Sequence, residues 1–439
     1  MSPFDVPKGR PVPSGRLARL ARLGGLAARV AGGTLAEGAR RIARGERPAL
    51  PDLLLTPGNL AQVAGRLAEM RGAAMKVGQL LSMDAGDLLP PEMSAILATL
   101  REGAEAMPPR QLGQVLDAEW GRDWRRGFAS FDVHPIAAAS IGQVHRARTR
   151  DGRDLAVKVQ YPGVARSIDS DVGNVATLLR LSGLVPAGLD LGPLLAEARQ
   201  QLHEEADYRR EAGNLGRARE LLADDTAFRV PGAHRDLTTP TILVMEWVPG
   251  EPVETLEAAP QQERDRVAGL LIDLALRELL EWGWMQTDPN PANYRVEPVT
   301  GRIVLYDFGA AREVGPRVAG LYREAFRAAR DGDREAALRT FEAFGAMDAA
   351  TPPGARDEAL ALFEVAAAAL LRQGPFDFGA TRLVEELRER GMALAADRAT
   401  WRAPPPGTLF IQRKLGGTYL LAARLRARVD LRALLDRRL

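Results

Sequence analysis

Residues 287–293 read Thr-Asp-Pro-Asn-Pro-Ala-Asn, and this short polar segment decides which fold we expect. It follows a helix-like pattern over residues 264–282 and precedes the apolar run Ile303-Val304-Leu305-Tyr306, which is typical of a buried strand. Within it, four residues separate Asp288 from Asn293. A carboxylate and an amide at this spacing on one loop can face a reacting group and hold a metal ion. The segment therefore predicts a catalytic loop.

Two further charged residues occur where such a loop would need them. Asp307 opens an Asp-Phe-Gly tripeptide directly after the strand candidate, and a carboxylate there can chelate Mg²⁺. Lys158 lies in the strand-like run Ala156-Val157-Lys158, where a lysine can pair with phosphates. Each motif alone is weak evidence. Lys158, Asp288, Asn293 and Asp307 in this order, each on the expected element, predict a protein-kinase-like fold that uses ATP with Mg²⁺.

A second Asp-Phe-Gly tripeptide occurs at residues 377–379. It follows Gly374-Pro375-Phe376 rather than an apolar strand, and no Asp-x-x-x-x-Asn segment precedes it at a suitable distance. We interpret it as a plain loop.

Lys158 needs an acidic partner, and one predicted helix over residues 194–214 carries four candidates: Glu204, Glu205, Asp207 and Glu211. Asp207 and Glu211 are four residues apart, so we expect them to share a helix face, with Glu205 partly off it. Composition and spacing do not choose among the four.

Two features depart from an ordinary protein kinase. Where a glycine-rich loop would cover the phosphates, the chain reads Ala137-Ala138-Ala139-Ser140, and alanine resists the positive φ angles that glycine allows. No Ala-Pro-Glu follows Asp307, and residues 317–330 already have a helical pattern. We therefore expect a stiff loop and little room for a peptide-docking activation segment.

Composition bounds the remaining possibilities. The 439 residues are 46% hydrophobic and 26% charged, which indicates a globular chain of two lobes. A net charge of +2 gives no electrostatic case for nucleic acid. The absence of cysteine excludes disulfides and thiolate metal sites, and the four histidines lack ligand spacing. With no apolar run long enough to span a bilayer and no secretory segment, we expect a cytoplasmic protein.

The expected organisation is α+β and bilobal. Residues 1–50 form an arm with a basic amphipathic helix, and 51–125 an added N-terminal helical region. Residues 126–250 form the N-lobe and 251–439 a helix-rich C-lobe. Within the arm, residues 16–29 alternate leucine and arginine at helical spacing. Such a helix either docks on the rest of the protein or lies on anionic lipid.

Several motifs together resemble the UbiB/ADCK family of atypical kinases. They are Lys76-x-Gly78-Gln79, Ala137 to His145, Lys158 with Gln160-Tyr161-Pro162-Gly163, Glu205-Ala206-Asp207-Tyr208, and Met285-Gln286-Thr287-Asp288-Pro289-Asn290. Residues 376–379 and Arg413-Lys414-Leu415-Gly416-Gly417 resemble the mitochondrial coenzyme Q branch in particular. Gln286 stands where ordinary kinases have histidine, in agreement with that branch.

The resemblance implies a kinase-like fold in which a helix with the KxGQ motif crosses the active site. It also implies ATP and Mg²⁺ as cofactors, ATPase activity, and support of ubiquinone biosynthesis at a membrane. The implied catalytic residues are Asp288, Lys158, Glu211 and Lys76. The implied nucleotide and metal ligands are Ala137, Ala138, Ala139, Ser140, Lys158, Glu246, Val248, Asn293 and Asp307, with Asn293 and Asp307 holding the metal. The implied regulatory residues are Lys76, Gln79, Glu205 and Asp207.

Three functions compete. The first is an ATPase or small-molecule kinase that supports quinone-lipid biosynthesis, with quinone precursors, biosynthetic enzymes and an anionic membrane surface as partners. The second is a protein kinase acting in trans, and the third is an ATP-gated scaffold or lipid chaperone. The occluding helix and the missing activation segment favour the first, peripheral on the inner membrane.

Deleting residues 16–29 distinguishes the two interpretations of the basic helix. If its leucines enter the acyl boundary, the deletion should reduce sedimentation with anionic vesicles and leave ATP binding intact. Equal sedimentation of the deletion variant and the parent protein would favour a docked helix instead.

Overall fold

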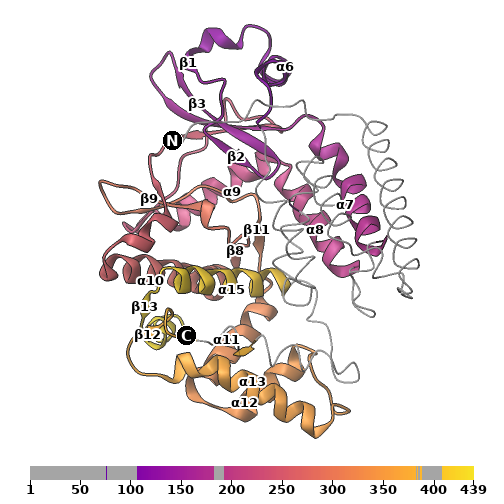
Figure 1. Cartoon of the computed structure of the whole chain (residues 1–439), viewed down its shortest axis with the longest axis vertical. Coiled ribbons are helices and arrows are strands. Elements are labelled where there is room, and N and C mark those ends of the chain that lie inside the picture. Colours follow the sequence, from indigo (N-terminus) through magenta and orange to yellow (C-terminus); the bar gives the residue numbers. More distant parts are fainter. Residues whose placement is uncertain (1–75, 77–105, 182–191, 382, 384–385, 388–407) are drawn as a thin grey trace, which may run out of the picture. The chain divides into compact units, whose positions relative to one another are not determined.

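The computed structural model describes residue 76 and residues 106–181, 192–381, 383, 386–387 and 408–439 (Figure 1). Of the N-terminal helical region predicted over residues 51–125, the structure describes only Lys76, which is helical, and residues 106–125. The predicted basic helix over residues 16–29 lies wholly outside the described residues. The chain divides into two compact units. Unit 1 is Met1–Arg217 with Pro231–Trp247, and unit 2 is Ala218–Val230 with Val248–Leu439.

Unit 1 contains an antiparallel sheet with strand order β1-β3-β4-β6, in which β2 also pairs with β3. The strands are β1 (Phe128–Phe131), β2 (Ala137–Ala139), β3 (Gly142–Thr149), β4 (Asp154–Gln160) and β6 (Ile242–Glu246). All residues of β4 after Asp154 are buried, because β3 and β6 cover both of its edges and side chains cover both faces. The sheet therefore holds Lys158 on its central strand.

The helices of unit 1 are α6 (Pro109–Trp120), the 3₁₀ turn Trp124–Gly127, α7 (Val164–Leu181), α8 (Gly192–Glu205) and α9 (Tyr208–Leu221), whose last residues belong to unit 2. Helices α7 and α8 pack side by side (Figure 1). The single helix predicted over residues 194–214 is wrong, because the chain breaks at Ala206–Asp207. Asp207 Oδ1 accepts hydrogen bonds from the backbone N–H groups of Arg209 and Arg210 at 3.0 and 3.2 Å. Asp207 therefore lies ahead of α9 and does not share a helix face with Glu211.

The alanine-rich segment forms a hairpin. Strand β2 turns at Ser140-Ile141 into β3, and no residue from Ala137 to Gly142 has a positive φ angle. Glycine is required at 142 for a different reason, since a Cβ atom there would lie 2.4 Å from the carbonyl oxygen of Val159. The segment is therefore an ordinary extended hairpin that alanine can adopt, held close to β4.

The described residues of unit 2 form three small sheets. In the largest, with order β5-β10-β9-β7, β5 (Phe228–Arg229) runs parallel to β10 (Ile303–Leu305), and β9 (Tyr294–Val296) pairs antiparallel with both β10 and β7 (Glu251–Pro252). Strand β8 (Trp284–Gln286) pairs with β11 (Ala311–Glu313), and β12 (Phe376–Asp377) pairs with β13 (Arg428–Val429). Because β8 and β9 flank residues 287–293, that loop is anchored at both ends.

Helices make up most of the rest of unit 2. They are the 3₁₀ turns Val253–Ala258 and Pro291–Asn293, α10 (Gln261–Arg277), the π-helical turn Glu278–Trp282, α11 (Pro316–Asp331), α12 (Arg334–Ala343), α13 (Pro353–Leu371), α15 (Leu409–Arg424) and α16 (Leu431–Asp436). Helix α15 runs beside α10 (Figure 1). Among the described residues no helix is long and apolar enough to span a bilayer.

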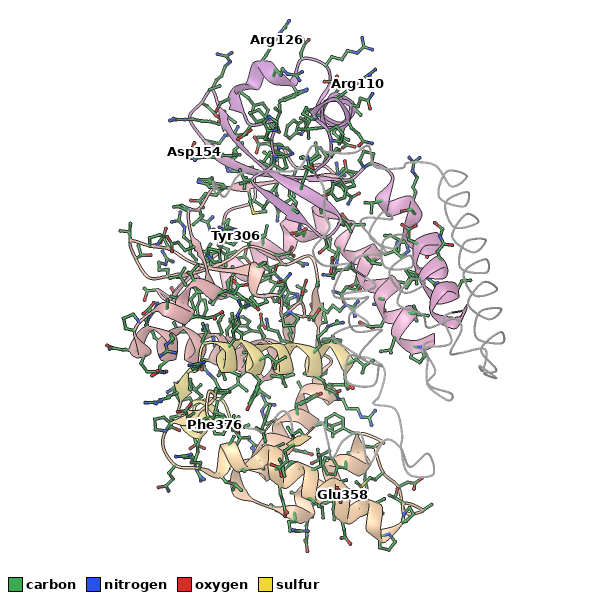
Figure 2. All side chains as sticks on the ribbon, in the orientation of Figure 1. Arg110, Arg126, Asp154, Tyr306, Glu358 and Phe376 are labelled. Atoms are coloured by element: carbon green, nitrogen blue, oxygen red, sulfur yellow. The ribbon has the colours of Figure 1, made fainter. Side chains whose placement is uncertain are left out.

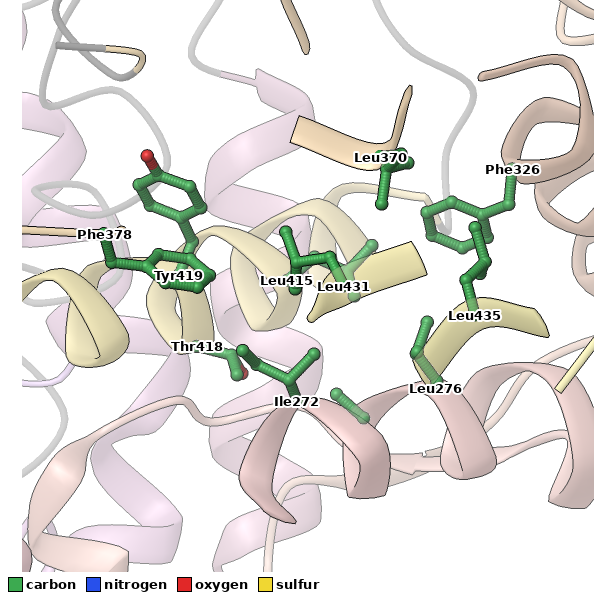
Figure 3. A pocket seen from close by; sticks show the side chains of 11 residues that line it. Ile272, Leu276, Phe326, Leu370, Phe378, Leu415, Thr418, Tyr419, Leu431 and Leu435 are labelled. Carbon is green, nitrogen blue, oxygen red and sulfur yellow. The ribbon is translucent and has the colours of Figure 1, made fainter. Parts of the chain in front are cut away.

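The interpretation of residues 377–379 as a plain loop is wrong for Asp377, which ends a strand, whereas Phe378 and Gly379 form a turn. Asp377 belongs to β12, and Phe378 is buried against Tyr419 with ring centroids 5.0 Å apart. The local sequence does not predict this strand, because its partner β13 is about fifty residues away in the chain. Phe378 lines an apolar cavity of about 150 Å³ between α10, α11, α15 and α16 (Figure 3). With no charged residue in its lining, this cavity is not suited to phosphate.

A buried histidine connects the sheet of unit 1 to the segment before α6. His145 Nδ1 lies 2.8 Å from the carbonyl oxygen of Asp132, so this nitrogen carries the proton. Its Nε2 then accepts from the Gln143 amide at 2.8 Å, and Gln143 Oε1 accepts from Met107 N at 2.7 Å. Burial lowers the pKa of His145 to about 4, so the ring is neutral near pH 7.

Folding should therefore weaken as the pH falls from about 6.5 to about 4. In this window the unfolded chain binds a proton at His145 that the folded chain excludes, at a cost of about 3 kcal/mol. Urea unfolding at pH 7.5 and pH 5 measures the loss. His145→Gln should reduce the pH dependence, whereas His134→Gln, at an exposed position, should leave it as in the parent. Identical pH dependence in both variants would contradict the assignment.

Candidate active site

Lys158 and Glu211 form a buried ion pair in unit 1. Lys158 Nζ lies 2.8 Å from Glu211 Oε1 and 3.0 Å from Oε2, and both residues are less than a tenth exposed. The ammonium also lies 5.2 Å from the ring centre of Tyr208, a distance at which a cation is attracted to the ring. The pair joins β4 to α9. Of the four acidic candidates, Glu211 is the one that this geometry places on Lys158.

Lys76 forms a second buried pair. Its Nζ lies 3.0 Å from Glu205 Oε1, and Lys76 is only 1% exposed. Gln201 donates to the same oxygen at 2.8 Å, so Glu205 is held from two sides. Asp207 is exposed and bonds to the backbone of α9, as described above. Gln79 lies outside the described residues. The structure thus brings together two of the four residues proposed as regulatory.

The remaining sequence candidates of unit 1 are Ala137, Ala138, Ala139 and Ser140, in and after β2, and Glu246 at the end of β6. Glu246 N donates to the carbonyl oxygen of Gly232 at 2.8 Å, which ties the end of β6 to the preceding segment. In unit 2, the Val248 carbonyl accepts from the hydroxyl of Tyr306, labelled in Figure 2, at 2.7 Å. These bonds fix the chain on both sides of Trp247.

The loop of residues 287–293 in unit 2 is held by its own polar groups. Asp288 Oδ1 accepts from Asn290 N at 3.2 Å, and Asn293 Nδ2 donates to the carbonyl oxygen of Asp288 at 3.2 Å. Thr287 Oγ1 donates to the Ala310 carbonyl at 2.7 Å, which connects this loop to the segment after Asp307. The two halves of the predicted catalytic loop and the Asp-Phe-Gly segment are thus fixed to one another.

Asn293 and Asp307 line the same small cavity of unit 2. Because Asn293 Nδ2 is used as a donor, its amide oxygen is the atom that it can offer to a cation. Asp307 adds a carboxylate, whose Oδ1 accepts from Gly309 N at 2.9 Å. Hard oxygen ligands of this kind suit Mg²⁺, which takes one or two protein groups and completes its shell with phosphates and water. The two residues therefore fit a nucleotide-bound Mg²⁺.

This cavity also contains a buried lysine, Lys414, which was not among the predicted site residues. Lys414 of α15 is 2% exposed, and its Nζ lies 2.8 Å from Tyr294 Oη, 3.1 Å from Gln286 Oε1 and 3.4 Å from Glu278 Oε2. Burial alone would lower the pKa of Lys414, but Glu278 and Tyr294 raise it above the ordinary value. Lys414 is therefore a cation.

Residue usage carries a signal that could have pointed to Lys414. The chain has only four lysines, at positions 8, 76, 158 and 414, against 55 arginines. The three lysines in the described part of the chain are all buried beside a glutamate. Lysine is compact and flexible, whereas arginine is a wide planar fork. In a chain that otherwise uses arginine, these three lysines coincide with enclosed sites that hold an ammonium beside a carboxylate.

Comparisons with known proteins show the family to which the chain belongs. The ABC1 atypical kinase-like domain matches residues 99–341. The chain is 37% identical to atypical kinase COQ8B, mitochondrial, of Rattus norvegicus over 98% of this chain and 81% of that protein. It is 36% identical to atypical kinase COQ8, mitochondrial, of Saccharomyces cerevisiae over 97% of this chain and 85% of that protein.

Among solved structures, the chain is similar to Rv3197 of Mycobacterium tuberculosis, solved in complex with erythromycin. The TM-score is 0.60 at 27% identity, over 86% of this chain and 95% of that chain. The expected α+β kinase-like fold is confirmed, so the class is that of protein-kinase-like chains. Within that class, the chain belongs to the ABC1 family of atypical kinases, also called UbiB/ADCK, as the sequence motifs predicted.

The Lys76–Glu205 contact should be energetically coupled. Removing one partner of a buried ion pair leaves an uncompensated charge, so Lys76→Met and Glu205→Gln should together cost less than the sum of their separate effects, by about 1–3 kcal/mol. Urea unfolding of the parent, both single variants and the double variant measures this coupling. The same cycle on the exposed pair Arg126–Asp123 should show no measurable coupling. Additive effects at Lys76 and Glu205 would contradict the pairing.

Proposed function

We propose that this chain is an ATP- and Mg²⁺-dependent atypical kinase or ATPase that supports ubiquinone biosynthesis. The proposal rests on one observation: within each unit, the residues expected to act on ATP and Mg²⁺ lie together and are held by hydrogen bonds or ion pairs. Unit 1 has the Lys158–Glu211 pair, and unit 2 has Asp288, Asn293 and Asp307 on one braced loop system. Membership of the atypical kinase family supports the same conclusion.

Each residue has a distinct chemical task. Asn293 and Asp307 hold the metal, which when bound neutralises charge on the phosphates. Lys158, oriented by Glu211, places its ammonium on phosphate oxygens. Asp288 orients the attacking hydroxyl or water and accepts its proton. The β2–β3 hairpin with Ala137, Ala138, Ala139 and Ser140 covers the phosphates, and Glu246 and Val248 offer backbone groups to the base.

The acceptor is water or a small molecule rather than a protein. Only six residues separate Gly309 from the start of α11 at Pro316, and three of them form β11. A peptide-docking activation segment does not fit in that interval. The buried Lys76–Glu205 pair supports the same proposal, because it holds the ammonium of Lys76 in the interior of unit 1. A protein kinase acting in trans and an ATP-gated scaffold or lipid chaperone remain the competing functions.

The quinone-lipid assignment rests on the relatives. Two proteins that the chain matches over most of their length are named COQ8 and COQ8B atypical kinases and are mitochondrial. We accordingly propose quinone precursors and the enzymes that process them as partners, at the surface of an anionic membrane. In a bacterial cell this corresponds to a cytoplasmic protein, peripheral on the inner membrane.

Asp307→Asn tests the metal assignment, and the chain supplies a matched control. Asp377 opens an identical tripeptide, and its Oδ1 accepts from Gly379 N at 2.9 Å, as Asp307 Oδ1 does from Gly309 N. Mg-ATP should raise the melting temperature of the parent and of Asp377→Asn but have a much smaller effect on Asp307→Asn, which lacks the carboxylate. Equal stabilisation of all three proteins would contradict the site.

Phosphate release with and without anionic liposomes, alongside a search for phosphorylated products, separates the competing functions. Release without a phosphorylated product identifies an ATPase, and a phosphorylated small molecule identifies a kinase. ATP binding without release would favour the scaffold.

A further inference from the structure

The ammonium of Lys414 contacts both ends of the loop proposed to be catalytic. Gln286 is the last residue of β8, just before the loop, and Tyr294 is the first residue of β9, just after it. Lys414 Nζ donates to Gln286 Oε1 at 3.1 Å and to Tyr294 Oη at 2.8 Å. One cation thus fixes the distance between Gln286 and Tyr294, the residues on either side of the loop that carries Asp288 and Asn293.

Glu278 supplies the negative charge that allows the Lys414 ammonium to be buried beside the loop. It lies in the π-helical turn after α10 and is 1% exposed, with Oε2 3.4 Å from Lys414 Nζ. A π-helical turn adds a residue to a helix and redirects its side chains, and such turns are frequent at functional sites. Because an ammonium only donates, its bond to Gln286 also fixes the amide of that residue, with Oε1 toward Lys414.

The middle of the same loop touches α15 directly. A Cβ atom at Gly417 would lie 2.3 Å from Pro289 Cβ, so the helix backbone and the loop are in contact only because residue 417 is glycine. Gly416, the neighbouring residue, is exposed and has open space where its Cβ would be. Two independent contacts, one polar and one steric, therefore join α15 to residues 286–294.

The network also reaches the metal ligands. The cavity lined by Asn293 and Asp307 is also lined by the residues of this network, which are Lys414, Glu278, Gln286 and Tyr294. The opposite face of α15 is apolar, since Leu415 and Tyr419 point into the large cavity beside α10 (Figure 3). The helix is thus packed from behind and presents Lys414 and Gly417 to the loop.

We propose that α15 positions the catalytic loop, with Lys414 as the positioning residue that holds both ends of residues 286–294 and Gly417 as the point of close contact. The inference rests on the proposed function for its effect on turnover, but the contact itself is independent of any nucleotide. The proposed role also accounts for a lysine at position 414 in a chain whose other cations are nearly all arginine.

Hydrogen exchange of the nucleotide-free protein tests the positioning by itself. The added methyl group of Gly417→Ala must displace Pro289 or α15, so amides of residues 286–294 should exchange at least ten-fold faster than in the parent. Gly416→Ala is the matched control and should exchange at the parental rate. Equal exchange in the two variants would overturn the proposal whatever the protein does with ATP.

Measuring kcat then distinguishes a contact that positions the catalytic loop from one that only stabilises the fold. Displacing a catalytic loop by a fraction of an ångström should lower kcat of Gly417→Ala at least ten-fold and raise the half-saturating Mg²⁺ concentration, while Gly416→Ala stays within about two-fold of the parent. A merely structural contact would lower the melting temperature and leave kcat per folded molecule unchanged, and that result would overturn the proposal. A parent protein without Mg-ATP turnover would instead refute the proposed function, and the exchange comparison would still decide the contact.

The variant Lys414→Arg tests whether any positive charge at position 414 is sufficient to position the loop. It keeps a cation beside Glu278, so it avoids the unpaired buried carboxylate that Lys414→Met would leave. A planar guanidinium does not reproduce the three contacts of the ammonium, so kcat should again fall at least ten-fold. Parental kcat and Mg²⁺ dependence in this variant would show that Lys414 is only a counter-ion and would overturn its positioning role.

Discussion

Lys158 Nζ lies 2.8 Å from Glu211 Oε1 in the interior of unit 1, and much of that unit is arranged so that this contact can exist. A lysine on the central strand of a sheet is desolvated, and it stays charged only with an acid beside it. Helix α9 supplies the acid, and the break at Ala206–Asp207 sets where that helix begins. The same rule, a buried ammonium matched by a buried carboxylate, recurs at Lys76 with Glu205 and at Lys414 with Glu278.

The distribution of cations makes this rule visible. Arginine supplies nearly all the positive charge, and many of its ion pairs lie at exposed positions where either cation would serve. In the described residues, lysine is found only where the cation is enclosed. A guanidinium brings five donors in a fixed plane, and a closed site with two or three acceptors would leave some of them unsatisfied.

The sequence predicted what is encoded over short spans. Asp288 with Asn293 and the tripeptide at Asp307 are local motifs next to strands, so their placement on one braced loop could be expected. The break before α9 was missed, because helical periodicity continues through residues 206 and 207 and only the side chain of Asp207 marks the new start. The strand at Asp377 was missed for a different reason, since pairing with β13 depends on residues far away in the chain. Lys414 was noticed only as part of a motif, because none of its three partners lies nearby in sequence.

The contact between Lys414 and Gln286 joins residues that are 128 positions apart. A chain made from its N-terminus presents Glu278 and the polar loop long before α15 exists. During that interval Glu278 has no ammonium beside it and is more stable in water than in an apolar core. The Lys414 contacts can therefore form only after α15 has been synthesised, so the surroundings of the loop are completed late in the synthesis of the chain.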